Sequence, residues 1–197
     1  MPRHTAAIIG GGVIGGGWAA RFLLNGWDVA VFDPDPEAKR KIGEVLAQAR
    51  WALPMLYDRA LPAEGSLRFC DTLADAVSNA DYIQERVHER LDLNRRVYSD
   101  IETANPRAPI GASTSGCKPS EVRSGLETGA RLSVAHPFNP VYLLPVVELV
   151  SAGSDAKAHA DVLSSIGMYP LEIGAEIDAH IADRHLAAFW REALWLV

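Results

Sequence analysis

The chain has few cysteines, no excess of basic residues and no long apolar run, and each shortage excludes a class of protein. Cys70 and Cys117 are the only cysteines among 197 residues, too few for a disulfide framework, which fits a reducing cytoplasm. Lysine and arginine total 19 against 25 acidic residues, so the net charge of −6 disfavours nucleic-acid binding. No apolar run approaches the roughly 18 residues of a membrane span. We therefore expect a cytoplasmic protein that binds neither membranes nor nucleic acids.

Secretory and metal-binding patterns are also missing. Arg3 precedes apolar residues, as in a secretory signal, but the glycines of 10–17 and then Arg21 interrupt that region. Neither Cys-x-x-Cys nor His-Glu-x-x-His occurs, and the five-residue spacing of His180 and His185 does not place both on one helix face. We expect no signal peptide and no metal site.

Short β-rich runs alternate with helical stretches along the chain, which is typical of βαβ units around a parallel sheet. The length suggests one full domain plus a remainder. Expected strands cover 6–9, 29–32, 67–69, 82–84, 109–112, 132–135, 146–150 and 171–173. Expected helices cover 13–24, 37–53, 73–78, 90–103, 155–166 and 179–197, with a loop or short helix in 54–65.

The last expected helix is amphipathic and has no stop signal. Its apolar residues are Ile181, Leu186, Phe189, Trp190 and Leu194. Residues 194–197 are all apolar, without a glycine, cap or polar tail, and such a terminus normally needs a partner surface. We expect the chain to lack a C-terminal portion; a short natural form is the alternative.

A glycine-rich run after the first expected strand satisfies the G-x-G-x-x-G pattern through Gly10, Gly12 and Gly15. In that pattern the first glycine permits a tight turn, the second lets a pyrophosphate approach the backbone, and the third allows close packing of helix on strand. The amides that begin the next helix, at Val13 and Ile14, and the helix dipole favour anionic phosphates.

An acidic residue supports a dinucleotide site. Asp33 ends the second expected strand, 23 positions after Gly10, where its carboxylate would bind ribose hydroxyls and repel a 2′-phosphate. A purely structural turn, with Asp33 opening the proline-rich loop 32–36, is the alternative. The combined context favours NAD over NADP and a Rossmann-type, doubly wound, mostly parallel α/β sheet.

A histidine follows the expected strand 132–135, where α/β sheets bind ligands. Because the ordinary pKa of an imidazole is close to neutrality, His136 could take a proton from a hydroxyl as hydride leaves the adjacent carbon. Glu148, on the next expected strand, could hold the other ring nitrogen. Spacing alone leaves open a structural histidine and a solvated Glu148.

These motifs together resemble the 3-hydroxyacyl-CoA dehydrogenase superfamily, in order along almost the whole chain. The glycine loop is common to many families, whereas the block from His136 to Glu148 is more specific. The segments that carry this resemblance are 10–17, Asp33, 112–116, 136–140 and Glu148. Within the superfamily, 18–26, 32–37 and 177–184 are similar to the carnitine 3-dehydrogenase branch.

The resemblance implies roles for individual residues. His136 would be the catalytic base, Glu148 its orienting partner, and Ser115 a hydrogen-bond donor to the reacting oxygen. Asn139 and Asp183 would lie near the substrate. Asp183 departs from the family pattern, because the superfamily generally carries an asparagine at this place on the first helix of its C-terminal domain.

The resemblance also implies an activity: NAD-dependent oxidation of the 3-hydroxyl of L-carnitine, in a homodimer. Residues 1–178 would form the NAD-binding domain, and 179–197 would begin an incomplete all-helical domain. One alternative is a sibling enzyme for 3-hydroxyacyl-CoA or a sugar acid such as gulonate, although the acidic charge disfavours the CoA form. The other is an NAD-binding module without turnover.

The segment 83–89 departs from the family pattern. Arg86 and His88 stand where the family usually has serine and proline, while Glu85 keeps its place and is expected on the nicotinamide side. Both departures could disturb the cofactor, or both side chains could point to solvent.

Aromatic residues of the last helix suggest one further hypothesis. Trp190 and Trp195, with Phe189, could offer aromatic faces to the quaternary ammonium group of carnitine. A core or dimer stripe at helical spacing is the alternative.

Overall fold

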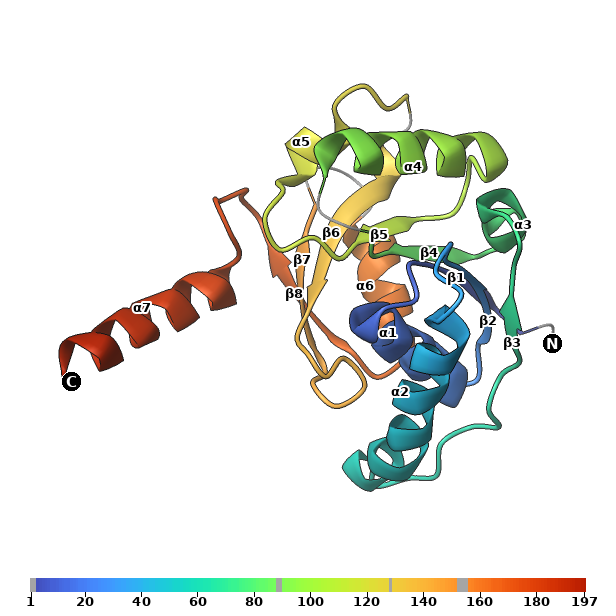
Figure 1. The fold of residues 1–197 in the computed structure, drawn as a ribbon, viewed down its shortest axis with the longest axis horizontal. Coiled ribbons are helices and arrows are strands. Elements are labelled where there is room, and N and C mark those ends of the chain that lie inside the picture. The colour runs from blue at the N-terminus through green and yellow to red at the C-terminus, as the bar shows by residue number, and fades with distance from the viewer. Residues whose placement is uncertain (1–2, 88–89, 128, 152–155) are drawn as a thin grey trace.

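In the part of the chain that the structure describes, eight strands form one sheet (Figure 1). The computed structural model describes residues 3–87, 90–127, 129–151 and 156–197. The strand order is β3-β2-β1-β4-β5-β6-β7-β8, and every neighbouring pair is parallel except β6 and β7. The strands are β1 (Thr5–Ile9), β2 (Asp28–Phe32), β3 (Leu67–Phe69), β4 (Tyr82–Glu85), β5 (Ile110–Ala112), β6 (Leu132–Pro137), β7 (Val146–Val150) and β8 (Tyr169–Ile173). The expected mostly parallel, doubly wound sheet is confirmed.

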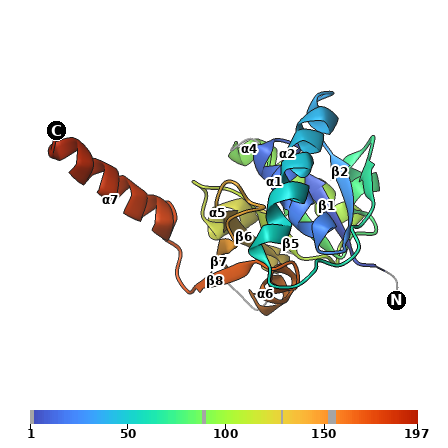
Figure 2. The same cartoon turned by 90° about the horizontal axis from the view of Figure 1, so that it is seen from below.

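Helices cover both faces of this sheet. The first buried cluster packs α1, α2 and α6 on one face, and the second packs α3, α4 and α5 on the other (Figures 1 and 2). The helices are α1 (Val13–Leu24), α2 (Ala38–Ala52), α3 (Leu73–Val77), α4 (Leu91–Ala104), α5 (Pro119–Arg123), α6 (Ala156–Ser165) and α7 (Ile181–Trp195). The part of the chain that the structure describes also has two 3₁₀ turns, η1 (Leu53–Leu56) directly after α2 and η2 (Gly129–Arg131) directly before β6.

The differences from the expected elements are local. The short helix α5 and the turn η2 were not anticipated, because each is too short for a periodic pattern to appear in the sequence. Strand β8 begins at Tyr169 instead of 171, and α7 begins at Ile181 instead of 179. The expected helix over 155–166 includes residue 155, which lies outside the described residues.

The strand order reverses between β1 and β4, which is the usual ligand-binding position of such a sheet. Strands β1, β2, β4, β5 and β6 are mutually parallel, so their carboxyl ends meet at one edge. The glycine loop follows β1 there, and His136 lies near the end of β6. Segments that are more than 120 positions apart in the sequence therefore share one edge.

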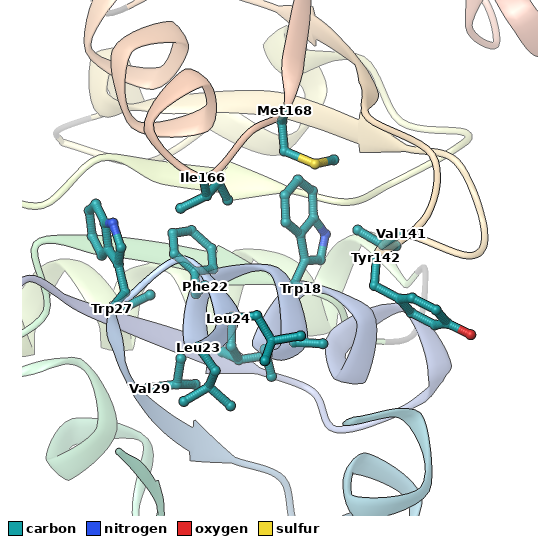
Figure 3. Packing of buried hydrophobic residues seen from close by; sticks show 14 of the residues in the cluster. Trp18, Phe22, Leu23, Leu24, Trp27, Val29, Val141, Tyr142, Ile166 and Met168 are labelled. Atoms are coloured by element: carbon teal, nitrogen blue, oxygen red, sulfur yellow. The ribbon is translucent and has the colours of Figure 1, made fainter. Parts of the chain in front are cut away.

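Helix α1 is buried from Gly15 to Leu24 and forms the centre of the larger cluster. Figure 3 shows Trp18 and Phe22 pointing toward Ile166 and Met168, which follow α6. The Phe22 ring also packs edge-on against Trp27, with centroids 5.2 Å apart. The face of the sheet that carries the glycine loop is therefore held by large, fully buried aromatic residues.

Helix α7 differs from the others because none of its residues is buried. It projects from the sheet in both views (Figures 1 and 2). Within the described residues, no helix has the length and apolarity needed to cross a bilayer. The large apolar side chains exposed on α7 and just after it are Leu186, Phe189, Trp190, Leu194, Trp195, Leu196 and Val197.

Replacing Phe22 by alanine should lower the free energy of unfolding by about 3–5 kcal/mol, because the ring is fully buried and its removal leaves a cavity. Urea unfolding followed by circular dichroism measures the change. Trp51→Ala is the matched control, since that aromatic side chain is 74% exposed on α2 and its loss should change stability by less than about 0.5 kcal/mol. Equal losses in the two variants would contradict this account of the core.

Candidate functional site

The glycine loop makes a turn that larger residues could not make. Gly10 has φ +105°, and a Cβ placed on it would lie 2.2 Å from the backbone oxygen of Arg86. A Cβ on Gly15 would lie 1.8 Å from the carbonyl oxygen of Gly10. The loop therefore closes against the end of β4 and against its own helix.

The start of α1 faces open space. Gly12 is the N-cap, and among the described residues no side chain caps the helix and no acidic residue lies in its first turn. A Cβ on Gly12 would meet no atom of the described residues within 4 Å, and the following Val13 is 60% exposed. Ile14, next in the chain, is half-buried against the core. Open backbone N–H groups at a helix N-terminus form a site that suits a pyrophosphate.

Asp33 lies beside this loop, just after the carboxyl end of β2. Its Oδ2 accepts a hydrogen bond from the backbone N–H of Gly11, and its Oδ1 accepts one from the N–H of Asp35 at 2.8 Å. The half-buried carboxylate therefore fixes the loop and stands where an acid can recognise ribose hydroxyls.

Glu85, at the end of β4, is almost completely buried. Its carboxylate accepts hydrogen bonds from the hydroxyl of Tyr98 and the backbone N–H of Val87, and Asn94 Nδ2 lies 3.4 Å away. Burial, followed by the Glu85 charge, raises the pKa of Tyr98 well above its usual value. These contacts tie β4 to α4, and the expected contact with the cofactor stays a prediction.

Arg86 and His88 are the two residues of this segment that depart from the family pattern. The Arg86 guanidinium donates a hydrogen bond to the carbonyl of Val87 at 2.9 Å, and the side chain is half-buried. His88 lies outside the described residues. Arg86 therefore lies at the edge of the glycine loop with its charge held by its own segment.

His136 and Glu148 face each other across the antiparallel pair of β6 and β7. Residues directly opposite in such a pair place their side chains on the same face. His136 is 8% exposed and Glu148 is 2% exposed. The two oxygens of Glu148 accept hydrogen bonds from the backbone N–H groups of Ile181 and Ala182, both at 2.8 Å. Glu148 therefore joins β7 to the start of α7, a role that the sequence did not indicate.

Two residues from α7 and its N-cap complete the cluster. Asp183 Oδ2 lies 3.8 Å from His136 Nε2. His180 stacks on His136 with ring centroids 4.2 Å apart and planes 20° apart, and its Nε2 lies 2.8 Å from the carbonyl oxygen of Thr114. Side-chain atoms of His136, Glu148 and His180 lie within 4.8 Å of one another. Nearly parallel ring planes do not direct two nitrogen lone pairs at one point, so we assign no metal site to this cluster.

Sequence reasoning missed the place of His180 because it considered this residue only as a metal ligand paired with His185. His180 lies 44 positions from His136, and no local pattern joins them. The contact arises because β7 and Glu148 bring the start of α7 to the end of β6. No sequence signal short of the tertiary fold would have found it.

The remaining expected site residues are Ser115, Asn139 and Trp190. Ser115 is exposed after β5 and lines a small hollow together with Glu148 and His180. Asn139 is exposed in the connection from β6 to β7. Trp190 is 59% exposed on the projecting helix α7. The structure therefore brings Ser115 to the cluster and leaves the aromatic cage at Trp190 a prediction.

A buried polar network centres on Ser113, directly after β5, and sequence reasoning missed it as well. Ser113 Oγ accepts hydrogen bonds from Trp18 Nε1 at 3.0 Å and from Gln84 Nε2 at 2.7 Å. Ser113 therefore joins α1 and β4 to the end of β5, two residues before Ser115. Tryptophan and glutamine within apolar runs were the available signal, because buried polar atoms usually need a partner.

Curated relatives match nearly all of this chain. It is 60% identical to the L-carnitine dehydrogenase/betainyl-CoA thioesterase of Ruegeria pomeroyi over 98% of this chain and 41% of that protein. It is 52% identical to the L-carnitine dehydrogenase of Mesorhizobium japonicum over 98% of this chain and 55% of that protein. The chain therefore spans about half, or less, of the length of these relatives.

Solved structures and a family model agree on the fold. An NAD⁺-dependent dismutase, 5-formyl-3-hydroxy-2-methylpyridine 4-carboxylic acid 5-dehydrogenase, aligns with a TM-score of 0.87 and 29% identity over 100% of this chain and 65% of its own. The 3-hydroxybutyryl-CoA dehydrogenase of Escherichia coli aligns at 0.75 with 23% identity over 87% of this chain and 38% of its own, which supports the fold alone. The family described as 3-hydroxyacyl-CoA dehydrogenase, NAD binding domain, matches residues 5–175. The chain belongs to this NAD-binding domain family of the 3-hydroxyacyl-CoA dehydrogenases.

Proposed function

We propose that this chain is an NAD-dependent dehydrogenase that oxidises the 3-hydroxyl of L-carnitine to a ketone. The observation that carries the proposal is the buried cluster of His136 with Glu148, on the same sheet edge as the open glycine loop. A proton acceptor and a dinucleotide site at one edge suit the removal of a proton and a hydride from one alcohol. Relatives named for L-carnitine support the choice of substrate.

The residues present fit NAD. NAD⁺, when bound, supplies the acceptor for the hydride. The N–H groups at the start of α1, beginning at Gly12, would hold its pyrophosphate, since a Cβ on that glycine would lie more than 4 Å from the other described residues. Asp33 would accept hydrogen bonds from the ribose hydroxyls and repel a 2′-phosphate, which favours NAD over NADP.

His136 would take the proton of the substrate hydroxyl. The ring becomes an imidazolium as it does so, and the negative charges of Glu148 and Asp183 nearby would stabilise that cation. Ser115, which lines a hollow with Glu148 and His180, would donate a hydrogen bond to the reacting oxygen. Burial of His136 and Glu148 strengthens these interactions, because water screens them less.

The direct test is NADH formation by the purified chain with L-carnitine and NAD, with NADP in a parallel reaction. We expect turnover with NAD and little with NADP. 3-Hydroxybutyryl-CoA and L-gulonate, offered in place of L-carnitine, test the sibling activities. Intact NAD binding without turnover of any of these substrates would contradict the proposal and favour a binding module.

A homodimer and a cytoplasmic location stay predictions, which gel filtration and cell fractionation would test.

Gly12→Ala should weaken NAD binding without loss of stability. Gly12 has φ −71°, which alanine adopts, and the added methyl group meets none of the residues that the structure describes but enters the space where the pyrophosphate would lie. The loss of charge-assisted hydrogen bonds should raise the dissociation constant about 10- to 100-fold, measured by calorimetry. Gly43→Ala, on the exposed side of α2, should leave NAD binding unchanged. An unchanged affinity of Gly12→Ala for NAD would show that the pyrophosphate does not bind at this loop.

His136→Gln should lower kcat for L-carnitine about 10²- to 10⁴-fold, because glutamine cannot accept the proton. The dissociation constant for NAD should change little, since the glycine loop is a separate segment. His4→Gln is the control, because His4 is an exposed histidine just before β1, at the opposite edge of the sheet. Full activity in His136→Gln would assign the proton transfer to another group.

A further inference from the structure

The ring of His136 is held by two aromatic neighbours in different orientations. His180 stacks on its face with centroids 4.2 Å apart, and Phe138 packs at 5.6 Å with an interplanar angle of 66°. These neighbours come from different parts of the chain, because Phe138 follows β6 and His180 precedes α7. The orientation of the His136 ring therefore depends on where α7 begins.

His180 is itself fixed on both sides. It is 5% exposed, and its Nε2 lies 2.8 Å from the carbonyl oxygen of Thr114, which accepts the ring hydrogen. It is the N-cap residue of α7, yet its side chain does not cap the helix; Glu148 accepts the first N–H groups instead. The ring of His180 is therefore directed toward His136, not toward its own helix.

We propose that His180 is a positioning residue for His136. It would present a fixed aromatic face that orients the His136 ring and stabilises the imidazolium formed when the proton arrives. This inference rests on the proposed function, in which His136 accepts that proton. A cation over an aromatic face is favoured by the electrons of the ring. Aromatic pairs of this kind change an equilibrium about three- to tenfold.

Several charged or titratable groups surround the stacked pair and act on the same proton. Glu148 and Asp183 favour a cation on His136, and their effect is present whether or not position 180 carries a ring. A variant that changes only the ring therefore separates stacking from charge. The other titratable groups that line the hollow beside His180 are Cys117, Lys118 and Glu176.

Three substitutions at this position separate the two contacts of His180. His180→Phe keeps the aromatic face and loses the hydrogen bond to Thr114. His180→Gln keeps an N–H donor and loses the ring, and His180→Ala loses both. His185→Ala is the control, since His185 is an exposed histidine on the same helix. Circular dichroism and the dissociation constant for NAD verify that each variant is folded.

Two readouts apply to each variant. The first is kcat with L-carnitine. The second is the NMR titration of the His136 ring resonances in the chain alone, which needs no turnover. If the chain proves inactive on L-carnitine, the titration still tests the stacking, so failure of the proposed function and failure of this inference remain distinguishable.

We expect His180→Ala and His180→Gln to lower kcat about three- to tenfold with unchanged NAD affinity, and to move the His136 titration midpoint to lower pH by about 0.5 to 1 unit. His180→Phe should restore most of both quantities, and His185→Ala should change neither. Rescue by glutamine but not phenylalanine would assign the effect to the Thr114 contact and overturn the proposal. If His180→Ala kept the wild-type titration midpoint of His136 and the wild-type kcat, the proposal would be overturned as well.

Discussion

The close contact of α1 with the segment after β6 holds the two parts of the site together. A Cβ on Gly17 would lie 2.7 Å from the Cβ of Val141, so only glycine permits this approach. One turn later, Arg21 Nε donates to the carbonyl of Val141 at 3.2 Å, and Nη1 donates to the hydroxyl of Tyr57 at 3.0 Å. Burial lowers the pKa of Arg21 from its usual value. The helix that begins at the glycine loop thus also supports the segment that directly follows β6, the strand that carries His136.

The reversal of chain direction at β7 determines the rest of the site. A parallel seventh strand would point its end toward the same edge as β6, whereas the antiparallel strand places Glu148 directly opposite His136. Helix α7 then begins at this carboxylate, and its first turn brings Asp183 and the preceding His180 to the same imidazole. Most of the polar groups around His136 therefore depend on one pair of strands.

The sequence predicts the sheet well because its signals are local. Glycine spacing, alternation of apolar runs and an acid after the second strand are visible within short windows, and β1, α1 and β2 lie within one residue of the expected bounds. The facing of His136 and Glu148 was also suggested by their places on consecutive strands. Pairing direction, by contrast, depends on the whole chain, so the sequence did not show that Glu148 accepts the N–H groups of α7. The stacking of His180 depends on the same tertiary contact and was missed for that reason.

Glu148 has a consequence for how the chain responds to its surroundings. The same carboxylate that lies beside His136 accepts the first two N–H groups available at α7. By thermodynamic reciprocity, any partner that shifts the position of α7 also changes the field at His136, and any charge that appears at His136 changes the strength with which α7 is held. The charge on His136 and the position of α7 are therefore thermodynamically coupled, so a change in one shifts the other.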